Sequence, residues 1–257
     1  MIVFGGTGFI GKSFSDLLSK KKIEYKSIGS KKVNFLKNDS FEKSLNILKN
    51  QDCIFFSSAV APCKNLNMYQ KNFTIFMNFL KIITKFVNYS KIIYISSDAV
   101  FSDSKNKITE NSNTSPENFH GLMHIQREIL LKNIVPKKKL CILRPTLVFG
   151  NEDPHNGYGP NQFFRLSKSK KDIYLFGKGE EKRDHIFIND LVKIIYNCYR
   201  TDFYGELNAV TGKLYTFNEI ANYFGEKYQV NIKFLKRKGL MPHGGYRAFN
   251  NNKLKRL

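Results

Sequence analysis

Tryptophan is absent from this chain of 257 residues, and cysteine is scarce. The four cysteines, at positions 53, 63, 141 and 198, form no C-x-x-C pair and have no histidine at zinc-finger spacing. This spacing predicts neither a disulfide framework nor a structural metal site. We therefore expect four buried thiols in a protein of the reducing cytoplasm.

Long apolar runs are also missing. A helix that spans a bilayer needs roughly 20 consecutive apolar residues, and no segment approaches that length. The N-terminus lacks the basic stretch and the apolar stretch of a secretion signal. The sequence therefore predicts no membrane span and no export, and we expect a cytoplasmic location.

Acidic residues are in short supply, because 21 Asp and Glu face 42 Lys and Arg and leave a formal net charge of +21. Such a charge favours nucleic acid, an acidic membrane surface or phosphorylated small molecules as partners. The lysines are spread along the chain, with short runs at 20–22, 137–139 and 236–238. Nucleic-acid binders concentrate charge on one face or in an arm, so we do not expect a nucleic-acid partner.

Apolar residues make up 42% of the chain, including 23 Phe, which is enough for a core. Short apolar segments alternate with amphipathic ones through the first 150 residues. The expected strands are Met1–Phe4, Glu24–Ile28, Cys53–Phe56, Lys91–Ile95 and Leu140–Leu143, and the expected helices are Ile10–Lys20, Ser40–Leu48, Asn67–Val87 and Glu117–Lys132. This alternation predicts an α/β fold with a doubly wound parallel sheet of the Rossmann type.

A turn-rich stretch, NEDPHNGYGPNQ at 151–162, predicts a domain boundary after residue 150. We expect a dinucleotide-binding domain at 1–150 and a smaller substrate-binding region at 151–257, of which about 183–200 packs back on the sheet. The last fifteen residues are basic and polar, which predicts a loosely held tail.

A glycine-rich motif follows the first strand. Residues 6–11, GTGFIG, fit G-x-G-x-x-G and open the first helix. Its glycines permit a tight turn, close approach of a pyrophosphate and close packing of helix on sheet. Because strand, motif and helix agree, we favour a dinucleotide site over an ordinary turn. The cofactor-binding residues expected here are Gly5, Gly8, Phe9, Ile10 and Gly11.

The end of the second strand bears on the choice of cofactor. NAD sites usually have an acidic residue there for the ribose diol, whereas this chain has Ser30, Lys31 and Lys32. A hydroxyl and two cations suit the 2′-phosphate of NADP. We therefore expect NADP, with NAD as the second choice, and the alternative is a solvated lysine pair.

Four segments carry a resemblance to a known family: GGTGFIG at 5–11, YISSDAVF at 94–101, LRPTLVFG at 143–150 and GKGEEKRDHIFINDLVKII at 177–195. The whole chain resembles the extended short-chain dehydrogenase/reductase family of NAD(P)-dependent sugar-nucleotide epimerases, dehydratases and 4-ketoreductases. It looks closest to the dTDP-4-dehydrorhamnose reductase type. The resemblance also implies oligomerisation through helices, such as a homodimer.

The resemblance implies roles for single residues. Ser97 holds the place of the residue that hydrogen-bonds the sugar oxygen, and Arg183 that of the arginine that binds substrate phosphate. Ser58, Ala59 and Pro145 lie where relatives contact the cofactor. Asn161 is a further substrate-binding candidate, for which loop capping is the alternative.

The chain departs from the family at the Tyr-x-x-x-Lys motif, because His120 and His124 occupy the two positions. Residues four apart lie on one helix face, so we treat them as a catalytic pair, with His124 also at the cofactor. A histidine near pKa 6.5 can exchange a proton at neutral pH without a lysine. Three alternatives remain. His120 transfers a proton directly, or the site binds cofactor and sugar nucleotide but carries out a different redox step or none, or the two histidines only form a solvated polar face of the helix. A zinc site would lack a third ligand.

The preferred function is an NADP-dependent reductase of a keto-sugar nucleotide in carbohydrate or cell-surface polysaccharide biosynthesis. Hydride would pass to the sugar carbonyl, which Ser97 polarises and His120 protonates. An epimerase or dehydratase of the same family is the alternative. A rival of another class is a non-catalytic regulatory or nucleic-acid-binding protein that has kept the fold.

Overall fold

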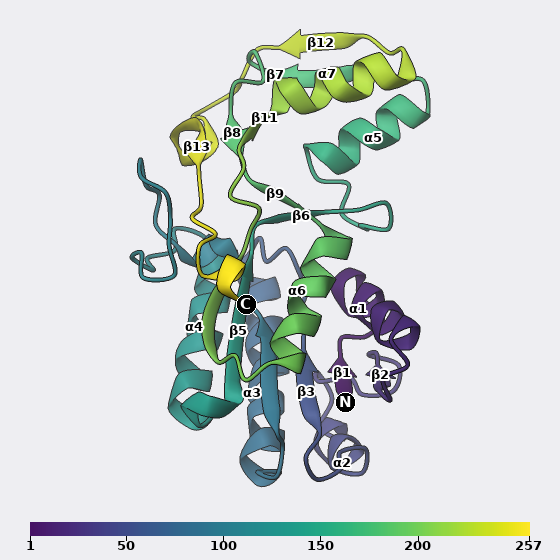
Figure 1. Cartoon of the computed structure of the whole chain (residues 1–257), viewed down its shortest axis with the longest axis vertical. Coiled ribbons are helices and arrows are strands. Elements are labelled where there is room, and N and C mark those ends of the chain that lie inside the picture. The colour runs from purple at the N-terminus through teal and green to yellow at the C-terminus, as the bar shows by residue number, and fades with distance from the viewer.

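A computed structural model describes residues 1–257 and shows an α/β architecture built on one parallel sheet (Figure 1). In spatial order its strands are β2 (Lys26–Ile28), β1 (Ile2–Phe4), β3 (Cys53–Phe56), β4 (Lys91–Ile95), β5 (Leu140–Pro145) and β10 (Gly205–Ala209). Every neighbouring pair is parallel. Strand β2 lies on one side of β1, and the chain then crosses back to place β3 on the other side. The boundary between β1 and β3 is therefore the topological switch point. The predicted doubly wound sheet is confirmed.

Continuous apolar runs explain why these segments become central strands. All four residues of β3, Cys-Ile-Phe-Phe, are buried, and so are all six residues of β5. A parallel strand has helices on both faces, so apolar residues are favoured at every position. The Gly-Glu-Leu-Asn-Ala sequence of β10 lacks this pattern, and for that reason it was not among the predicted strands.

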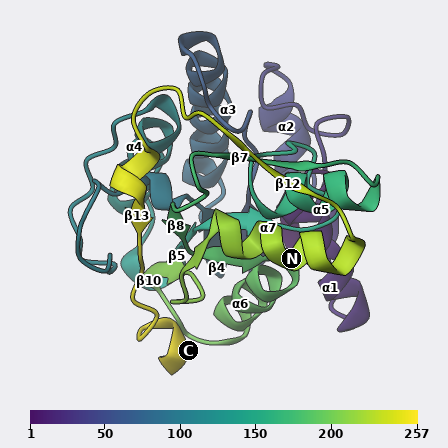
Figure 2. The same cartoon turned by 90° about the horizontal axis from the view of Figure 1, so that it is seen from above.

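Helices cover both faces of the sheet (Figure 2). One face carries α2 (Ser40–Leu45), α3 (Leu66–Lys85) and α4 (Phe119–Ile134), and the other carries α1 (Phe9–Lys20) and α6 (Ile188–Arg200). Helix α4 begins two residues later than predicted, because the side chain of Asn118 accepts the N–H of Gly121 and caps the first turn. None of the helices combines the length and the apolar character needed to cross a membrane.

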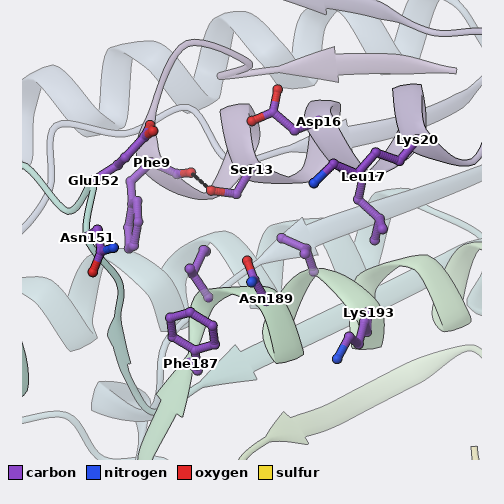
Figure 3. A pocket seen from close by; sticks show the side chains of 12 residues that line it. Phe9, Ser13, Asp16, Leu17, Lys20, Asn151, Glu152, Phe187, Asn189 and Lys193 are labelled. Carbon is purple, nitrogen blue, oxygen red and sulfur yellow. Dashed lines mark hydrogen bonds between the residues drawn. The ribbon is translucent and has the colours of Figure 1, made fainter.

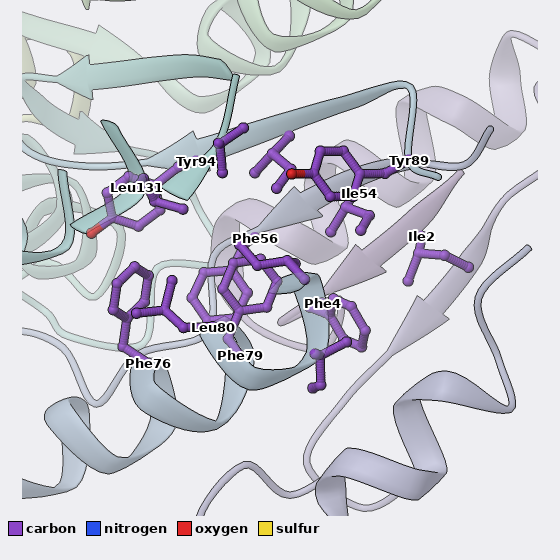
Figure 4. Packing of buried hydrophobic residues seen from close by; sticks show 14 of the residues in the cluster. Ile2, Phe4, Ile54, Phe56, Phe76, Phe79, Leu80, Tyr89, Tyr94 and Leu131 are labelled. Carbon is purple, nitrogen blue, oxygen red and sulfur yellow. The ribbon is translucent and has the colours of Figure 1, made fainter. Parts of the chain in front are cut away.

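An aromatic cluster fills the space between the sheet and α3 (Figure 4). Phe56 of β3 stacks on Phe79 of α3, with ring centroids 3.9 Å apart and planes inclined by 21°. Phe4 meets Phe79 edge-on at 6.2 Å, and Phe76 lies 6.0 Å from both rings of the stack. Such contacts add to the free energy gained by burial, so phenylalanine supplies the bulk that tryptophan does not.

A smaller unit lies beyond the carboxyl ends of the strands, at the top of Figure 1. Its core packs helices α5 and α7 on each other and on β7. The elements of this unit are α5 (Pro160–Lys168), β7 (Ile173–Phe176), β8 (Lys182–Arg183), β11 (Tyr215–Thr216), α7 (Phe217–Tyr228), β12 (Ile232–Leu235) and β13 (Tyr246–Arg247). The parallel pair β6 (Leu147–Phe149) and β9 (His185–Phe187) joins it to the sheet. Four 3-10 turns complete the chain: η1 (Asp98–Val100), η2 (Lys137–Lys139), η3 (Pro242–Gly245) and η4 (Leu254–Arg256).

The last fifteen residues are not the loose tail that their composition predicts. Arg247 and Phe249 are both 2% exposed. The Arg247 guanidinium donates from Nε to Asp98 at 2.9 Å and from Nη1 to Asp103 at 3.0 Å, and Phe249 packs on Phe101. The prediction was wrong because a long-range ion pair leaves no trace in local composition.

Removal of one stacked ring should measure how much the aromatic cluster stabilises the fold. We expect Phe79→Ala to lower the free energy of unfolding by about 3–5 kcal/mol, because it deletes a fully buried ring and leaves a cavity against Phe56. Urea unfolding followed by circular dichroism measures this loss. Phe73→Ala, on the same helix but 44% exposed, is the control and should stay within about 0.5 kcal/mol of the parent. Equal losses in both variants would contradict the assignment.

Candidate active site

A glycine-rich turn joins β1 to α1 at the carboxyl edge of the sheet. Gly5 has a φ of +85°, and a side chain at Gly11 would overlap the carbonyl oxygen of Gly5. Gly8 caps the helix, whose first residues are Phe9 and Ile10. The turn is therefore a narrow cradle beside the free N–H groups of a helix start, which fits the pyrophosphate of a dinucleotide.

The end of β2 lies against this turn, because Gly5 and Gly6 both donate their N–H groups to the carbonyl of Ile28. Ser30, Lys31 and Lys32 follow and are exposed. Neither lysine forms an ion pair within the protein. Two lysines without an acidic partner thus follow the strand end that contacts the glycine turn.

The end of β3 forms the other wall of the turn. The hydroxyl of Ser57 donates to the carbonyl of Phe4 at 3.2 Å, and the backbone of Ser58 passes directly behind Gly5. Ser58 and Ala59 thereby lie at the switch point, where open α/β sheets bind ligands.

Two serines follow β4, and only one has a free proton. Ser96 donates its hydroxyl to Glu128 at 2.6 Å and is buried. Ser97 accepts the N–H of Ala99 at 3.1 Å and caps η1, which leaves its own hydroxyl proton for another acceptor. Ser97 is therefore the serine that can donate to a bound ligand.

His120 and His124 lie one turn apart on α4, with ring centroids 4.7 Å apart and planes at 88°. His120 Nδ1 accepts the backbone N–H of Cys63 at 3.4 Å, and His124 Nδ1 lies 2.6 Å from the Tyr94 hydroxyl. Burial, reinforced by the charge of Arg127, lowers the pKa of His120 and places that of His124 well below its usual value. Both rings are therefore neutral at pH 7.

Arg127 lies beneath the two histidines and is 2% exposed. Its guanidinium donates to the carbonyl of Ser58 at 3.1 Å and to Asn72 at 2.9 and 3.1 Å, while its Nε has no partner. Arg127 follows His124 by three residues on the same helix, but its contact with the end of β3 depends on folding.

A buried ion pair that the sequence did not predict joins α4 to β5 next to the site. The guanidinium of Arg144 on β5 donates to the carboxylate of Glu128 on α4, from Nε at 3.0 Å and from Nη2 at 2.6 Å. Arg144 lies in the LRPTLVFG segment noted in the sequence, whereas Glu128 lies in no segment singled out there. Tyr94 and Cys63 carried no comparable signal, because their contacts join segments far apart in the chain.

The residues expected on the substrate side have partners within the protein. Arg183 donates from Nε to buried Glu181 at 2.6 Å, which leaves its Nη groups for a ligand. The amide of Asn161 accepts the N–H of Gly150 and donates to Asp153, so it holds the turn after β6. Pro145 ends β5 and pairs with β10.

His185 of β9 is a buried histidine without a role from sequence. Neither ring nitrogen has a hydrogen-bond partner, and the ring meets Phe217 edge-on at 5.6 Å. Burial, helped by the charge of Arg183, lowers its pKa to about 4. The folded protein therefore holds this ring neutral over a wide range of pH.

A cavity of about 410 Å³ lies between α1 and α6 (Figure 3). The apolar part of its lining includes Phe9, Leu17 and Phe187. The polar part includes Asp16 and Lys20. Of the residues in the glycine turn and α4 described above, only Phe9 reaches it. The cavity is thus separate from the strand ends that carry Ser58, Ser97 and His120.

Helix α4 approaches η1 so closely that a side chain at Gly121, next to His120, would overlap the carbonyl oxygen of Ala99, and we call this meeting place the Ser97–His120 edge. Together with the strand order and the glycine turn, it defines a dinucleotide-binding α/β protein with a candidate site of the short-chain dehydrogenase/reductase type. The chain belongs to the NAD dependent epimerase/dehydratase family, whose profile matches residues 1–207. This match confirms the resemblance seen in the sequence and identifies the chain as a member of an enzyme family.

Individual relatives are distant. ADP-L-glycero-D-manno-heptose-6-epimerase of Fusobacterium nucleatum is 24% identical over an alignment that covers 86% of this chain and 77% of the relative. UDP-glucose 4-epimerase of Thermotoga maritima, solved with UDP-glucose, superposes with a TM-score of 0.85 at 19% identity, over 99% of this chain and 91% of that one. dTDP-4-dehydrorhamnose reductase of Bacillus anthracis, solved with NADP, gives 0.80 at 18% identity, over 99% and 91%. At these identities the solved structures show the shared fold.

His185 should make stability depend on pH. Its pKa is about 4 in the folded protein and near 6.5 in the unfolded chain, so the unfolded chain binds the proton first as the pH falls below 6.5. Stability is therefore unaffected above pH 6.5 and falls by up to about 3 kcal/mol as the pH approaches 4. In His185→Phe this part of the loss should disappear, as measured by urea unfolding at pH 7 and 4.5. His155→Gln, at an exposed histidine, is the control, and a pH response in His185→Phe equal to that of the parent would refute the assignment.

Proposed function

We propose that this protein is an NADP-dependent reductase that acts on the carbonyl of a nucleotide-activated keto sugar. The observation that carries the proposal is that the glycine turn and the free donors of the Ser97–His120 edge lie at the same end of one sheet. When bound, a reduced nicotinamide would supply a hydride to the sugar carbonyl carbon.

The residues of the chain divide the work. The glycine turn and the start of α1 hold the pyrophosphate, while Ser58, Ala59 and Pro145 border the rest of the cofactor. Ser97 donates a hydrogen bond from its free hydroxyl to the sugar oxygen, and His120 lies next to it at the Ser97–His120 edge. Arg183 offers its Nη groups to the substrate phosphates.

Lys31 and Lys32 support NADP as the cofactor, because they stand unpaired at the place where a 2′-phosphate would lie. The family is described by its dependence on NAD, whereas the similar Bacillus anthracis reductase binds NADP. The two lysines are the feature of this chain that favours the second.

An epimerase is the second candidate, because two of the similar proteins carry that name. A dehydratase is less well supported. It would need an acid beside Ser97, and the neighbouring Asp98 carboxylate is engaged by the Arg247 guanidinium at 2.9 Å.

Fluorescence titration with NADPH and NADH tests the cofactor. We expect NADPH to bind at least 10-fold more tightly, and the double variant Lys31→Ser/Lys32→Ser to lose about 10-fold in NADPH affinity with NADH unchanged. Lys137→Ser/Lys138→Ser removes the same charge before β5, at the opposite end of the sheet, and serves as the control. No binding of either dinucleotide would reject the proposed function.

Turnover is the second readout. A panel of UDP-, GDP-, ADP- and dTDP-linked 4-keto sugars, followed through loss of NADPH absorbance, should contain at least one substrate. A protein that binds NADPH, reduces none of them and interconverts the corresponding sugar nucleotides would favour the epimerase.

A further inference from the structure

His120 occupies a position that disfavours a positive charge. It is the second residue of α4, where the helix presents unpaired N–H groups and the positive end of its dipole. An imidazolium there would be repelled by the helix, as well as by Arg127 two turns further along.

A backbone group fixes where His120 carries its proton. The N–H of Cys63 can only donate, and it is directed at His120 Nδ1 at 3.4 Å. Nδ1 is therefore the acceptor nitrogen, and the single proton of the neutral ring is on Nε2. Protonation of Nδ1 would place two N–H groups against each other.

The surrounding groups add to this preference. His124, packed edge-on, is buried and neutral, and Arg127 and His155 act against a charge on His120. Asp98 acts in the opposite sense, but its carboxylate is shared with Arg247. The Cys63 thiol stays protonated, because burial raises its pKa. Together these contacts hold the ring neutral.

We propose that His120 serves as a neutral hydrogen-bond donor through Nε2–H and keeps its proton throughout the reaction, with Ser97 as the second donor to the same oxygen. A neutral imidazole at a helix start can polarise a carbonyl in this way. This inference rests on the proposed reduction and changes the role that the sequence suggests for His120, which is proton transfer.

The step balances without a proton from histidine. The carbonyl carbon gains the hydride and forms a C–H bond, while the electron pair of the C=O double bond moves to oxygen. That oxygen is stabilised by the two donors and takes the proton that completes the hydroxyl from water.

Nitrogen NMR of the full-length protein, labelled with ¹⁵N-histidine and free of ligand, reads the tautomer directly. The signals of His120 are assigned by their loss in His120→Gln. We expect the neutral Nε2–H pattern of His120 at pH 7 and 8, because the ring loses its charge below the usual pKa of histidine. An imidazolium that forms with a midpoint near 6.5, or an Nδ1–H tautomer, would overturn the inference.

Two substitutions separate donation from proton transfer. The side-chain amide of His120→Gln offers an N–H near the place of Nε2 but does not titrate, so kcat should stay within about 10-fold and remain flat from pH 5.5 to 8. His120→Phe has no donor, and kcat should fall by about 10²–10³. Unchanged NADPH affinity and Tm in both variants show that the fold is retained.

Equal inactivity of the two variants would show that His120 transfers a proton, and the inference would fail. If the parent protein reduces no keto sugar, the proposed function fails instead, and the NMR tautomer still decides the state of His120 by itself.

Discussion

The buried ion pair between Glu128 and Arg144 is the constraint on which the candidate site depends. Both side chains are almost fully excluded from water, at 0% and 2% exposure, where an unpaired charge would cost several kcal/mol. Two guanidinium contacts and the Ser96 hydroxyl satisfy the carboxylate. Helix α4 therefore cannot slide along β4 and β5 without uncovering a charge, and this fixes the place of His120 relative to Ser97.

The two histidines change which side chain of α4 carries a permanent positive charge near the site. The related enzymes that the sequence resembles carry a lysine where this chain has His124, and so place a permanent charge on the face of the helix. Here the permanent charge belongs to Arg127, which is directed into the wall of the site and donates to the carbonyl of Ser58. The permanent charge thus belongs to a buried side chain, and the two histidine rings are neutral chiefly because burial lowers their pKa values, with Arg127 adding to the effect.

Local pattern was enough to predict the sheet, the glycine turn and the family. Apolar runs and helical periodicity report burial, and the glycine motif has its own steric signature. Contacts between distant segments could not be predicted, because nothing near Cys63 indicates that its N–H meets His120. The sixth strand was missed because its sequence is half polar. Arg183 was recognised from its motif, but its pairing with Glu181 two residues earlier depends on how the strand folds.

Arg247 makes the order of synthesis matter. It is separated from Asp98 by 149 positions, and it is translated after every element that it holds in place. At about 5–20 residues per second the ribosome needs roughly 7–30 s to cover that distance, far longer than a helix or a loop takes to form. During this interval the segment after Ser97 lacks its clamp, although every residue of the glycine turn has been translated. The two ends of the site are thus separated in synthesis by most of the length of the chain.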